Sequence, residues 1–123
     1  MVRGIRGATT VDEDDADEIV LRTQELLRAL LSANGAKPEE VASAIFTLTD
    51  DLESAFPAVA ARRLEGWENV PLLCAREIPV PGAPKQCIRV LLHWNTELPA
   101  SRIQHAYLRG ARALRPEWAA DPQ

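Results

Sequence analysis

The segment Val70–Asn95, VPLLCAREIPVPGAPKQCIRVLLHWN, decides how the rest of the chain is arranged. It reads as two apolar, strand-like runs separated by a stretch rich in proline and glycine. Each run carries a charged residue that an interior strand would avoid: Glu77 in the first and Arg89 in the second. In the second run, apolar residues alternate with residues that point to the same side as Arg89. This alternation predicts a strand with one apolar side. The apolar positions of the second run are Ile88, Val90, Leu92 and Trp94.

We predict a hairpin that folds about Gly82 and places Ala75 opposite Arg89. Glu77 would then lie opposite Cys87 and diagonally across from Arg89, roughly 7 to 8 Å away at the backbone. Part of a small ligand fits between a carboxylate and a guanidinium at that separation. A register slip of one residue would move the two to opposite faces. A cross-strand ion pair on a solvated edge is the structural alternative.

Composition narrows the class of protein. The 123 residues suit one domain, and 46% hydrophobic with 26% charged residues is typical of a globular chain. No apolar run has the length of a membrane span, and the opening residues lack the apolar core of a signal peptide. The net charge of −4 argues against nucleic acid as a partner.

The two cysteines, Cys74 and Cys87, have no metal-type spacing, and we interpret them as reduced, buried thiols of a cytoplasmic protein, with a disulfide as the lesser alternative. Arginine supplies 12 of the 14 basic residues. Composition bias could explain that excess, but arginine also binds carboxylates in a planar, two-pronged way that lysine cannot match.

The first strand is expected at Val2–Val11, where Gly4 and Gly7 allow close approach of another backbone or a ligand. Arg3 and Arg6 have opposite parity, so one can face solvent while the other faces an anion.

A long helix is expected at Asp14–Ala33 because apolar residues recur there at steps of three and four. Asp15 and Glu18 resemble a capping box, and Gly35 is the expected stop. The acidic cluster Asp12–Asp15 is therefore interpreted as capping and solvation, with a metal site as the alternative. The helix would pack its apolar stripe on the sheet.

The remaining elements are shorter. Trp67 is expected to anchor a loop on the core, and residues 100–114 are expected to form a terminal helix that Gly110 interrupts. Arg109 and Arg112 on it are interpreted as a solvated face, and residues 119–123 as a disordered tail. The other expected elements are a helical turn at Lys37–Val41, a strand at Ser43–Thr49 and a short helix at Ala58–Leu64.

Motifs for phosphate, dinucleotide, zinc or nucleophile-elbow chemistry are absent from the sequence. His93 and His105 are interpreted as structural residues, although either could in principle be catalytic. What remains is a pocket rich in arginine, with one carboxylate and one phenol, which suits a small polycarboxylate.

Several blocks, in collinear order over nearly the whole chain, resemble the monofunctional chorismate mutases of the small trimeric class. They are VRGIRGATTV, SAFPAVAARRL, VPLLCAREIPV, KQCIRVLLHWNT and HAYLRGARALRP. The resemblance implies a single domain over residues 1–118 with an α+β fold, a pseudo-α/β-barrel subunit that has a mixed sheet, one long helix and short helices. It also implies a homotrimer with active sites between subunits, and conversion of chorismate to prephenate without cofactor or metal.

The resemblance also implies roles for individual residues. Arg89 would donate to the ether oxygen, and Glu77 would contact the ring hydroxyl. Arg6 and Tyr107 would hold substrate carboxylates, with Arg62 and Arg115 as mobile arginines near the entrance. The chain departs from some members at Val59, where they carry a lysine, so a secondary carboxylate contact is in doubt. The apolar and backbone wall would comprise Phe56, Ala58, Leu72, Leu73 and Cys74, with Leu114 as a lid contact.

The parity of Cys74 and Glu77 suggests how such a site is shared. Three residues apart on a strand, they leave opposite faces and would serve two neighbouring pockets. We therefore expect Glu77, Arg89, Arg6 and Tyr107 from one subunit, and Phe56 and Cys74 from the next. The alternatives are a trimeric imine/enamine deaminase of the RidA-like kind, whose arginine-containing block this chain lacks, and a non-catalytic trimer that binds small carboxylates.

Overall fold

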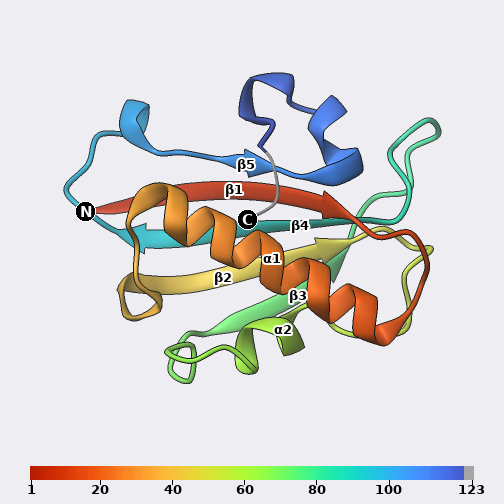
Figure 1. The fold of residues 1–123 in the computed structure, drawn as a ribbon, viewed down its shortest axis with the longest axis horizontal. Coiled ribbons are helices and arrows are strands. Elements are labelled where there is room, and N and C mark those ends of the chain that lie inside the picture. Colours follow the sequence, from red (N-terminus) through yellow and green to blue (C-terminus); the bar gives the residue numbers. More distant parts are fainter. Residues whose placement is uncertain (121–123) are drawn as a thin grey trace.

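The computed structural model describes residues 1–120, which form one curved sheet crossed by one long helix (Figure 1). The strands are β1 (Val2–Thr10), β2 (Val41–Leu48), β3 (Leu72–Arg76), β4 (Cys87–Asn95) and β5 (Ala106–Tyr107). The α-helices are α1 (Ala16–Asn34) and α2 (Ala58–Arg62). Short 3-10 turns are η1 (Pro38–Glu40), η2 (Ala100–Arg102), η3 (Arg109–Ala113) and η4 (Pro116–Trp118).

The sheet is mixed, with the strand order β3-β2-β4-β1-β5. β4 lies in the middle and pairs antiparallel with both β1 and β2, while the outer pairs β2–β3 and β1–β5 are parallel. One long helix, short helical segments and a mixed sheet are the predicted α+β architecture, which is confirmed.

The predicted hairpin about Gly82 is wrong. β3 and β4 are both strands, but β2 lies between them, so the Pro/Gly segment is a crossover and not a turn between paired strands. Ala75 pairs with Thr47 of β2, and Thr47 pairs in turn with Arg89 of β4. Glu77 and Arg89 still meet, because both reach across this intervening strand.

Helix α1 covers one face of the sheet with its apolar stripe. Ile19, Leu26, Leu27 and Leu30 are fully buried, and burial of each such side chain stabilises the fold by about 1.5 to 3 kcal/mol. Gly7 of β1 makes the close approach possible, because a Cβ there would lie 2.8 Å from a methyl group of Leu30. The expectation that a glycine of this strand admits a close neighbour is confirmed.

Both ends of α1 are capped as predicted. The Asp15 carboxylate accepts a hydrogen bond from the Glu18 N–H at 2.9 Å, and Gly35 ends the helix at φ 62°. The Glu18 carboxylate reaches back to the N–H groups of Asp12 and Glu13. Asp14 accepts from two further backbone N–H groups, which lower its pKa, so the acidic cluster serves backbone groups as expected.

The predicted terminal helix is also wrong. The segment 100–114 divides into η2, the short strand β5 and η3, because the free edge of β1 offers backbone partners to residues 106 and 107. Tyr107 therefore lies on a strand, almost fully buried. The predicted tail begins at Ala119, which forms a bridge with Tyr107, whereas residues 121–123 lie outside the described part of the chain.

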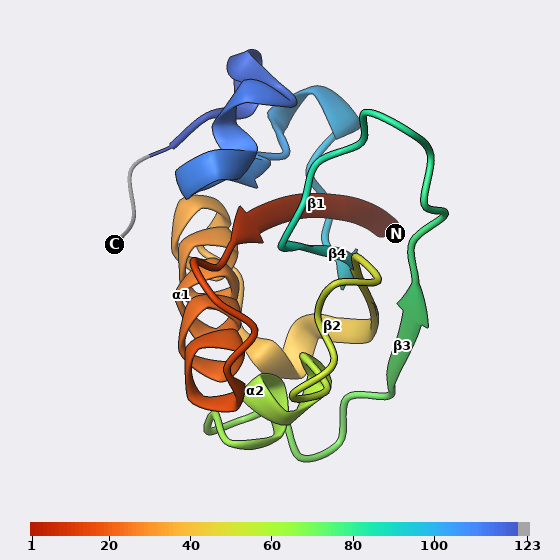
Figure 2. The same ribbon diagram turned by 90° about the vertical axis from the view of Figure 1, so that its right-hand side faces the viewer.

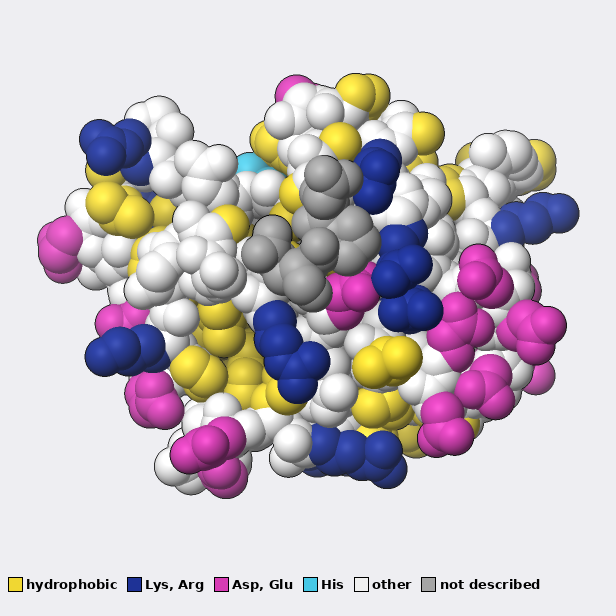
Figure 3. All heavy atoms as spheres, viewed as in Figure 1, with side chains coloured by type: hydrophobic (Ala, Val, Ile, Leu, Met, Phe, Trp, Pro, Cys, Tyr) yellow, Lys and Arg dark blue, Asp and Glu magenta, His cyan; other side chains and the backbone are white. Residues whose placement is uncertain are grey.

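The two faces of the sheet differ. Figure 2 shows α1 running along one side of the strands, with the C-terminal segments beyond β1. On the opposite face, the C-terminal segments cover Ala8 and Tyr107, whereas Leu73 is 63% exposed. No helix within residues 1–120 is long and apolar enough to cross a membrane. Acidic side chains gather where α1 begins (Figure 3).

Candidate active site

A row of residues crosses the sheet on the face away from α1. The pairing register places Ala75, Thr47, Arg89, Ala8 and Tyr107 side by side on five successive strands. Arg89 is thus at the centre of the sheet, where its backbone is bonded on both sides. A side chain on such a strand is held more firmly than one on a loop.

Arg89, Glu77 and Thr47 form the polar centre of this row. Arg89 Nε lies 3.1 Å from Glu77 Oε2, with side chains 31% and 16% exposed. That N–H is nevertheless poorly aimed at the carboxylate and has no hydrogen-bond acceptor within residues 1–120, although the atom is buried. The Thr47 hydroxyl donates to Glu77 Oε2 at 2.7 Å. The carboxylate is therefore fixed by Thr47, and Arg89 pairs with it through Nε.

A small cavity of about 190 Å³ opens beside Arg89. Arg6, Ile45, Thr47 and Leu91 are among the residues that line it. Arg6 and Ile45 both pair with Leu91, so they belong to the row next to that of Arg89. The arrangement places two guanidinium groups at a cleft with apolar walls, which suits a small anion. Glu77 lies beside Arg89 but lines a separate hollow of about 230 Å³.

Tyr107 and the C-terminal residues border this site. The Tyr107 side chain packs in one cluster with Ala8, and Leu114 and Trp118 pack against it. The guanidinium carbon of Arg115 lies 3.7 Å from the centre of the Trp118 ring, and that of Arg6 lies 5.7 Å from it. The structure therefore brings together six of the predicted site residues. They are Arg6, Glu77, Arg89, Tyr107, Leu114 and Arg115.

The other predicted site residues line separate hollows. Phe56 and Cys74 line a cavity of about 360 Å³, with Phe56 68% exposed. Arg62 and Leu72 line another of about 330 Å³. Within the described chain these side chains share no cavity with Arg89. Two residues remain: Ala58 is buried at the start of α2, and Leu73 is exposed on the face that holds Arg89.

Neither cysteine forms a disulfide, as expected. Cys87 is fully buried, and burial raises the pKa of its thiol to about 11. Arg89 opposes this shift and Glu77 adds to it. The Cys87 thiol is thus neutral and unreactive at physiological pH, a packing residue beneath the site.

Arg109 is the other predicted residue that needs correction. It was expected on a solvated face, but its guanidinium donates two hydrogen bonds to Glu25, at 2.8 and 2.9 Å. These bonds lower the pKa of Glu25 and raise that of Arg109. The pair ties η3 to α1 and lies apart from the cavity of Arg89.

Sequence reasoning missed two residues of the site, Thr47 and Trp118. Thr47 shares the parity of Ser43 and Ile45, but its role follows only from the position of β2 between β3 and β4. Both histidines are hydrogen-bonded, as the structural interpretation predicts. His93 Nδ1 lies 2.8 Å from the hydroxyl of Ser43, and His105 Nδ1 accepts from the N–H of Arg6.

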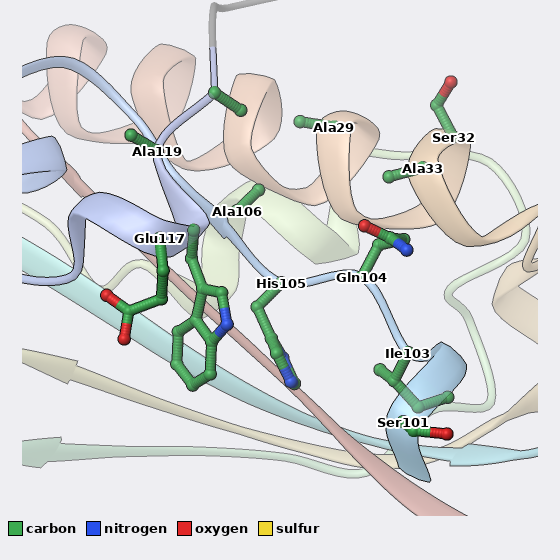
Figure 4. Close-up of a pocket in the computed structure, with 12 residues that line it drawn as sticks. Ala29, Ser32, Ala33, Ser101, Ile103, Gln104, His105, Ala106, Glu117 and Ala119 are labelled. Carbon is green, nitrogen blue, oxygen red and sulfur yellow. The ribbon is translucent and has the colours of Figure 1, made fainter. Parts of the chain in front are cut away.

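A further cavity of about 410 Å³ lies between α1 and the C-terminal segments (Figure 4). Ala29, Ser32 and Ala33 of α1 line one wall, whereas His105 and Glu117 lie across from them. Arg89 and Glu77 do not line this cavity. Within residues 1–120 no cluster of three or more potential metal ligands is present.

Comparison with known proteins gives concordant results at the level of family, sequence and structure. The family described as chorismate mutase type I matches residues 2–118. Chorismate mutase AroH of Thermus thermophilus is 57% identical over 118 residues, 95% of this chain and 96% of the relative. Chorismate mutase AroH of Bacillus subtilis is 44% identical over 117 residues, 95% of this chain and 92% of the relative. A solved chorismate mutase from Clostridium thermocellum superimposes with a TM-score of 0.88 at 49% identity, covering 90% of this chain and 98% of that one.

Proposed function

This chain belongs to the chorismate mutase type I family, and we propose that Arg89 and Glu77 are the groups that carry its reaction. The enzyme converts chorismate to prephenate, an isomerisation on the route to phenylalanine and tyrosine. The deaminase and the non-catalytic alternatives are set aside by this membership. The observation that supports the proposal is the position of Arg89, which lines a cavity on the central strand beside a carboxylate held by Thr47.

The reaction needs positioning and charge stabilisation. An ether C–O bond breaks while a C–C bond forms, and the ether oxygen gains negative charge as the bond to carbon lengthens. Arg89 would donate hydrogen bonds to that oxygen from a fixed position, so no reorganisation is needed when the charge develops. Glu77 would contact the ring hydroxyl and face the ring as it becomes electron-poor.

Chorismate is a dianion that must be bound in a compact, chair-like shape. Arg6 and Tyr107 would hold its carboxylates, and Arg115 would act nearer the entrance. Phe56, Ala58, Leu72, Leu73 and Cys74 would form the wall, with Arg62 and Leu114 at the margin. No proton moves in the chemical step, so we propose that neither histidine acts as an acid or base.

Magnitudes show that Arg89 cannot act alone. A million-fold acceleration requires about 8 kcal/mol of transition-state stabilisation. One preorganised donor at a developing oxyanion contributes about 3 to 4 kcal/mol. Holding the substrate in its reactive shape can supply several more. The guanidinium groups and the apolar walls would therefore share the task.

We propose that the enzyme is a cytoplasmic homotrimer whose active sites lie between subunits. Two observations support active sites that are shared between subunits. The sheet face that holds Arg89 also bears the exposed side chain of Leu73 on β3. No helix within residues 1–120 covers this face at β3. The predicted wall residues Phe56 and Cys74 line a different cavity from Arg89 within one chain. A second copy would complete the site with these residues.

Ultraviolet loss of chorismate and formation of prephenate measure the activity directly. The shared site is tested with two variants that should each be inactive, Arg89→Ala and Phe56→Asp. The two are mixed, unfolded and then refolded together. Random assembly would restore about a quarter of the sites, because some interfaces then receive both intact halves. Each variant refolded alone is the control. No recovery in the mixture, or a monomer with full activity, would refute a site shared between subunits.

A further inference from the structure

The C-terminal segment is fixed against β5 by its backbone. The N–H of Ala120 donates to the Tyr107 carbonyl at 3.0 Å, and Ala119 bridges to the same residue. The N–H of Trp118 donates to the Arg115 carbonyl at 2.8 Å. The indole of Trp118 is thereby held beside the end of the candidate active site that contains Tyr107.

Four side chains meet the Trp118 ring. The His105 and Tyr107 rings lie 4.1 and 5.7 Å from it, centre to centre. The Arg115 guanidinium lies 3.7 Å from the ring centre and that of Arg6 lies 5.7 Å, both within the range of a cation–π contact. Two of these four residues, Arg6 and Tyr107, are assigned above to the substrate carboxylates, and a third, Arg115, to the entrance of the site.

Charge explains why an aromatic ring suits this position. Two guanidinium groups near one another repel before a dianion arrives, and the negative face of an indole offsets part of that repulsion. His105 adds no third charge, because burial and then the nearby Arg6 and Arg115 lower its pKa. Its ring instead accepts a hydrogen bond from the backbone N–H of Arg6 at 3.0 Å.

Arg115 is held from two directions. Its guanidinium carbon lies 3.7 Å from the centre of the Trp118 ring, and its Nε donates to Glu117 at 3.0 Å. The terminal nitrogens of the guanidinium are the donors that this arrangement leaves for a carboxylate. An apolar residue of similar volume could hold the segment, but it could not attract the guanidinium groups.

We propose that Trp118 is a positioning residue whose indole face orients the guanidinium groups of Arg6 and Arg115 toward the carboxylates of chorismate. This inference rests on the proposed substrate-binding roles of those two arginines. Trp118 need not touch the reacting atoms. Its effect is therefore on substrate binding more than on the chemical step.

Two substitutions separate an electrostatic role of the ring from simple packing. Trp118→Phe keeps an aromatic face, whereas Trp118→Leu keeps only apolar volume. We expect the leucine variant to raise KM for chorismate about tenfold with kcat within about threefold, and the phenylalanine variant to stay within about threefold in both. Pro116→Ala is a matched control that loosens the same segment and leaves the ring, with KM expected to be unchanged.

A double-mutant cycle with Arg115→Ala distinguishes the possible failures. If Trp118 acts through Arg115, Trp118→Leu adds much less in the Arg115→Ala background than alone. If Arg115→Ala and Arg6→Ala leave KM unchanged, the proposed binding roles are wrong. If they raise KM while leucine and phenylalanine at position 118 behave alike, the positioning role is wrong. Should Trp118→Leu fail to fold, Trp118→Met compared with Trp118→Tyr makes the same test.

Discussion

Two arginine–carboxylate pairs in this protein have the same composition but differ in which groups bond the carboxylate. Arg109 donates to both carboxylate oxygens of Glu25, at 2.8 and 2.9 Å. Arg89 lies 3.1 Å from Glu77, but its buried N–H has no acceptor in the described chain, and Thr47 supplies the hydrogen bond to that carboxylate. The first pair is complete, with both carboxylate oxygens bonded to the arginine, whereas in the second the carboxylate bonds to Thr47 and contacts Arg89 only through Nε.

This difference separates a structural contact from a binding group. A closed, bidentate pair between η3 and α1 joins two elements and has little left to offer a ligand. The Arg89 guanidinium of the second pair also lines a cavity beside Arg6, and in the proposed mechanism its remaining N–H groups meet a substrate atom there.

The largest effect is expected at Arg89. Arg89→Lys should lower kcat/KM by about a hundredfold or more, because a lysine cannot reproduce the planar guanidinium donors. The same change at the other pair, Arg109→Lys, is the matched control and should leave activity within about twofold. Steady-state assays of chorismate loss measure both. An Arg89→Lys enzyme within a few-fold of the parent would contradict the catalytic role of this pair.

A smaller loss of activity is expected when Glu77 is kept but loses the hydrogen bond that holds its carboxylate. Thr47→Val deletes the hydroxyl that donates to Glu77 at 2.7 Å, which should lower kcat about tenfold with little change in unfolding temperature. Ser43→Ala on the same strand deletes a hydroxyl that bonds His93 outside the cavity, so it controls for the loss of a β2 hydrogen bond. Equal kinetics for the two variants would show that Thr47 does not position Glu77.

The complete pair should affect stability alone. Arg109→Gln should leave kcat/KM within about twofold and lower the unfolding temperature by about 2 to 5 °C. The effect is modest because the Arg109 and Glu25 side chains are 35% and 14% exposed, so solvent screens the pair. Differential scanning fluorimetry beside the activity assay decides the matter. A large loss of activity without a thermal shift would place Arg109 in the site.

Acid should abolish the stabilisation of the fold by the pair of Arg109 and Glu25. The Arg109 hydrogen bonds lower the pKa of Glu25 in the folded state below its ordinary 4.5, so this pair stabilises the fold fully above that value. The contribution is lost as pH falls through the lowered, folded-state pKa. The unfolding temperatures of parent and Arg109→Gln should therefore differ at neutral pH and converge well below pH 4.5. A gap that persists into strong acid would contradict this.

Elements governed by local sequence were predictable. The alternation in Val2–Val11, the stripe and caps of α1, and the anchoring of Trp67 all follow from nearby residues, and the structure confirms each. The pairing of strands was not, since the sequence between β3 and β4 contains no sign that β2 inserts between them. A long-range partner decided the register that the hairpin prediction had assigned locally.

The prediction of a terminal helix was wrong for a related reason. Residues 106 and 107 complete the edge of β1, so tertiary pairing outweighed the helical pattern of residues 100–114. The same distinction between local and long-range information applies to the site residues. Arg89 and Glu77 could be identified from unusual charges in apolar runs and from family resemblance. Thr47 and Trp118 required the strand order and the fold of the C-terminal segment.

The role of Arg89 can be tested most directly by a crystal structure of the enzyme with a stable diacid that mimics the bicyclic transition state. We predict its ether oxygen about 3 Å from a guanidinium nitrogen of Arg89, with Glu77 still bonded to Thr47 and with Phe56 of a neighbouring subunit closing the cavity. A mimic bound elsewhere, or one whose ether oxygen faces water while Arg89 points away from it, would show that Arg89 does not stabilise the transition state.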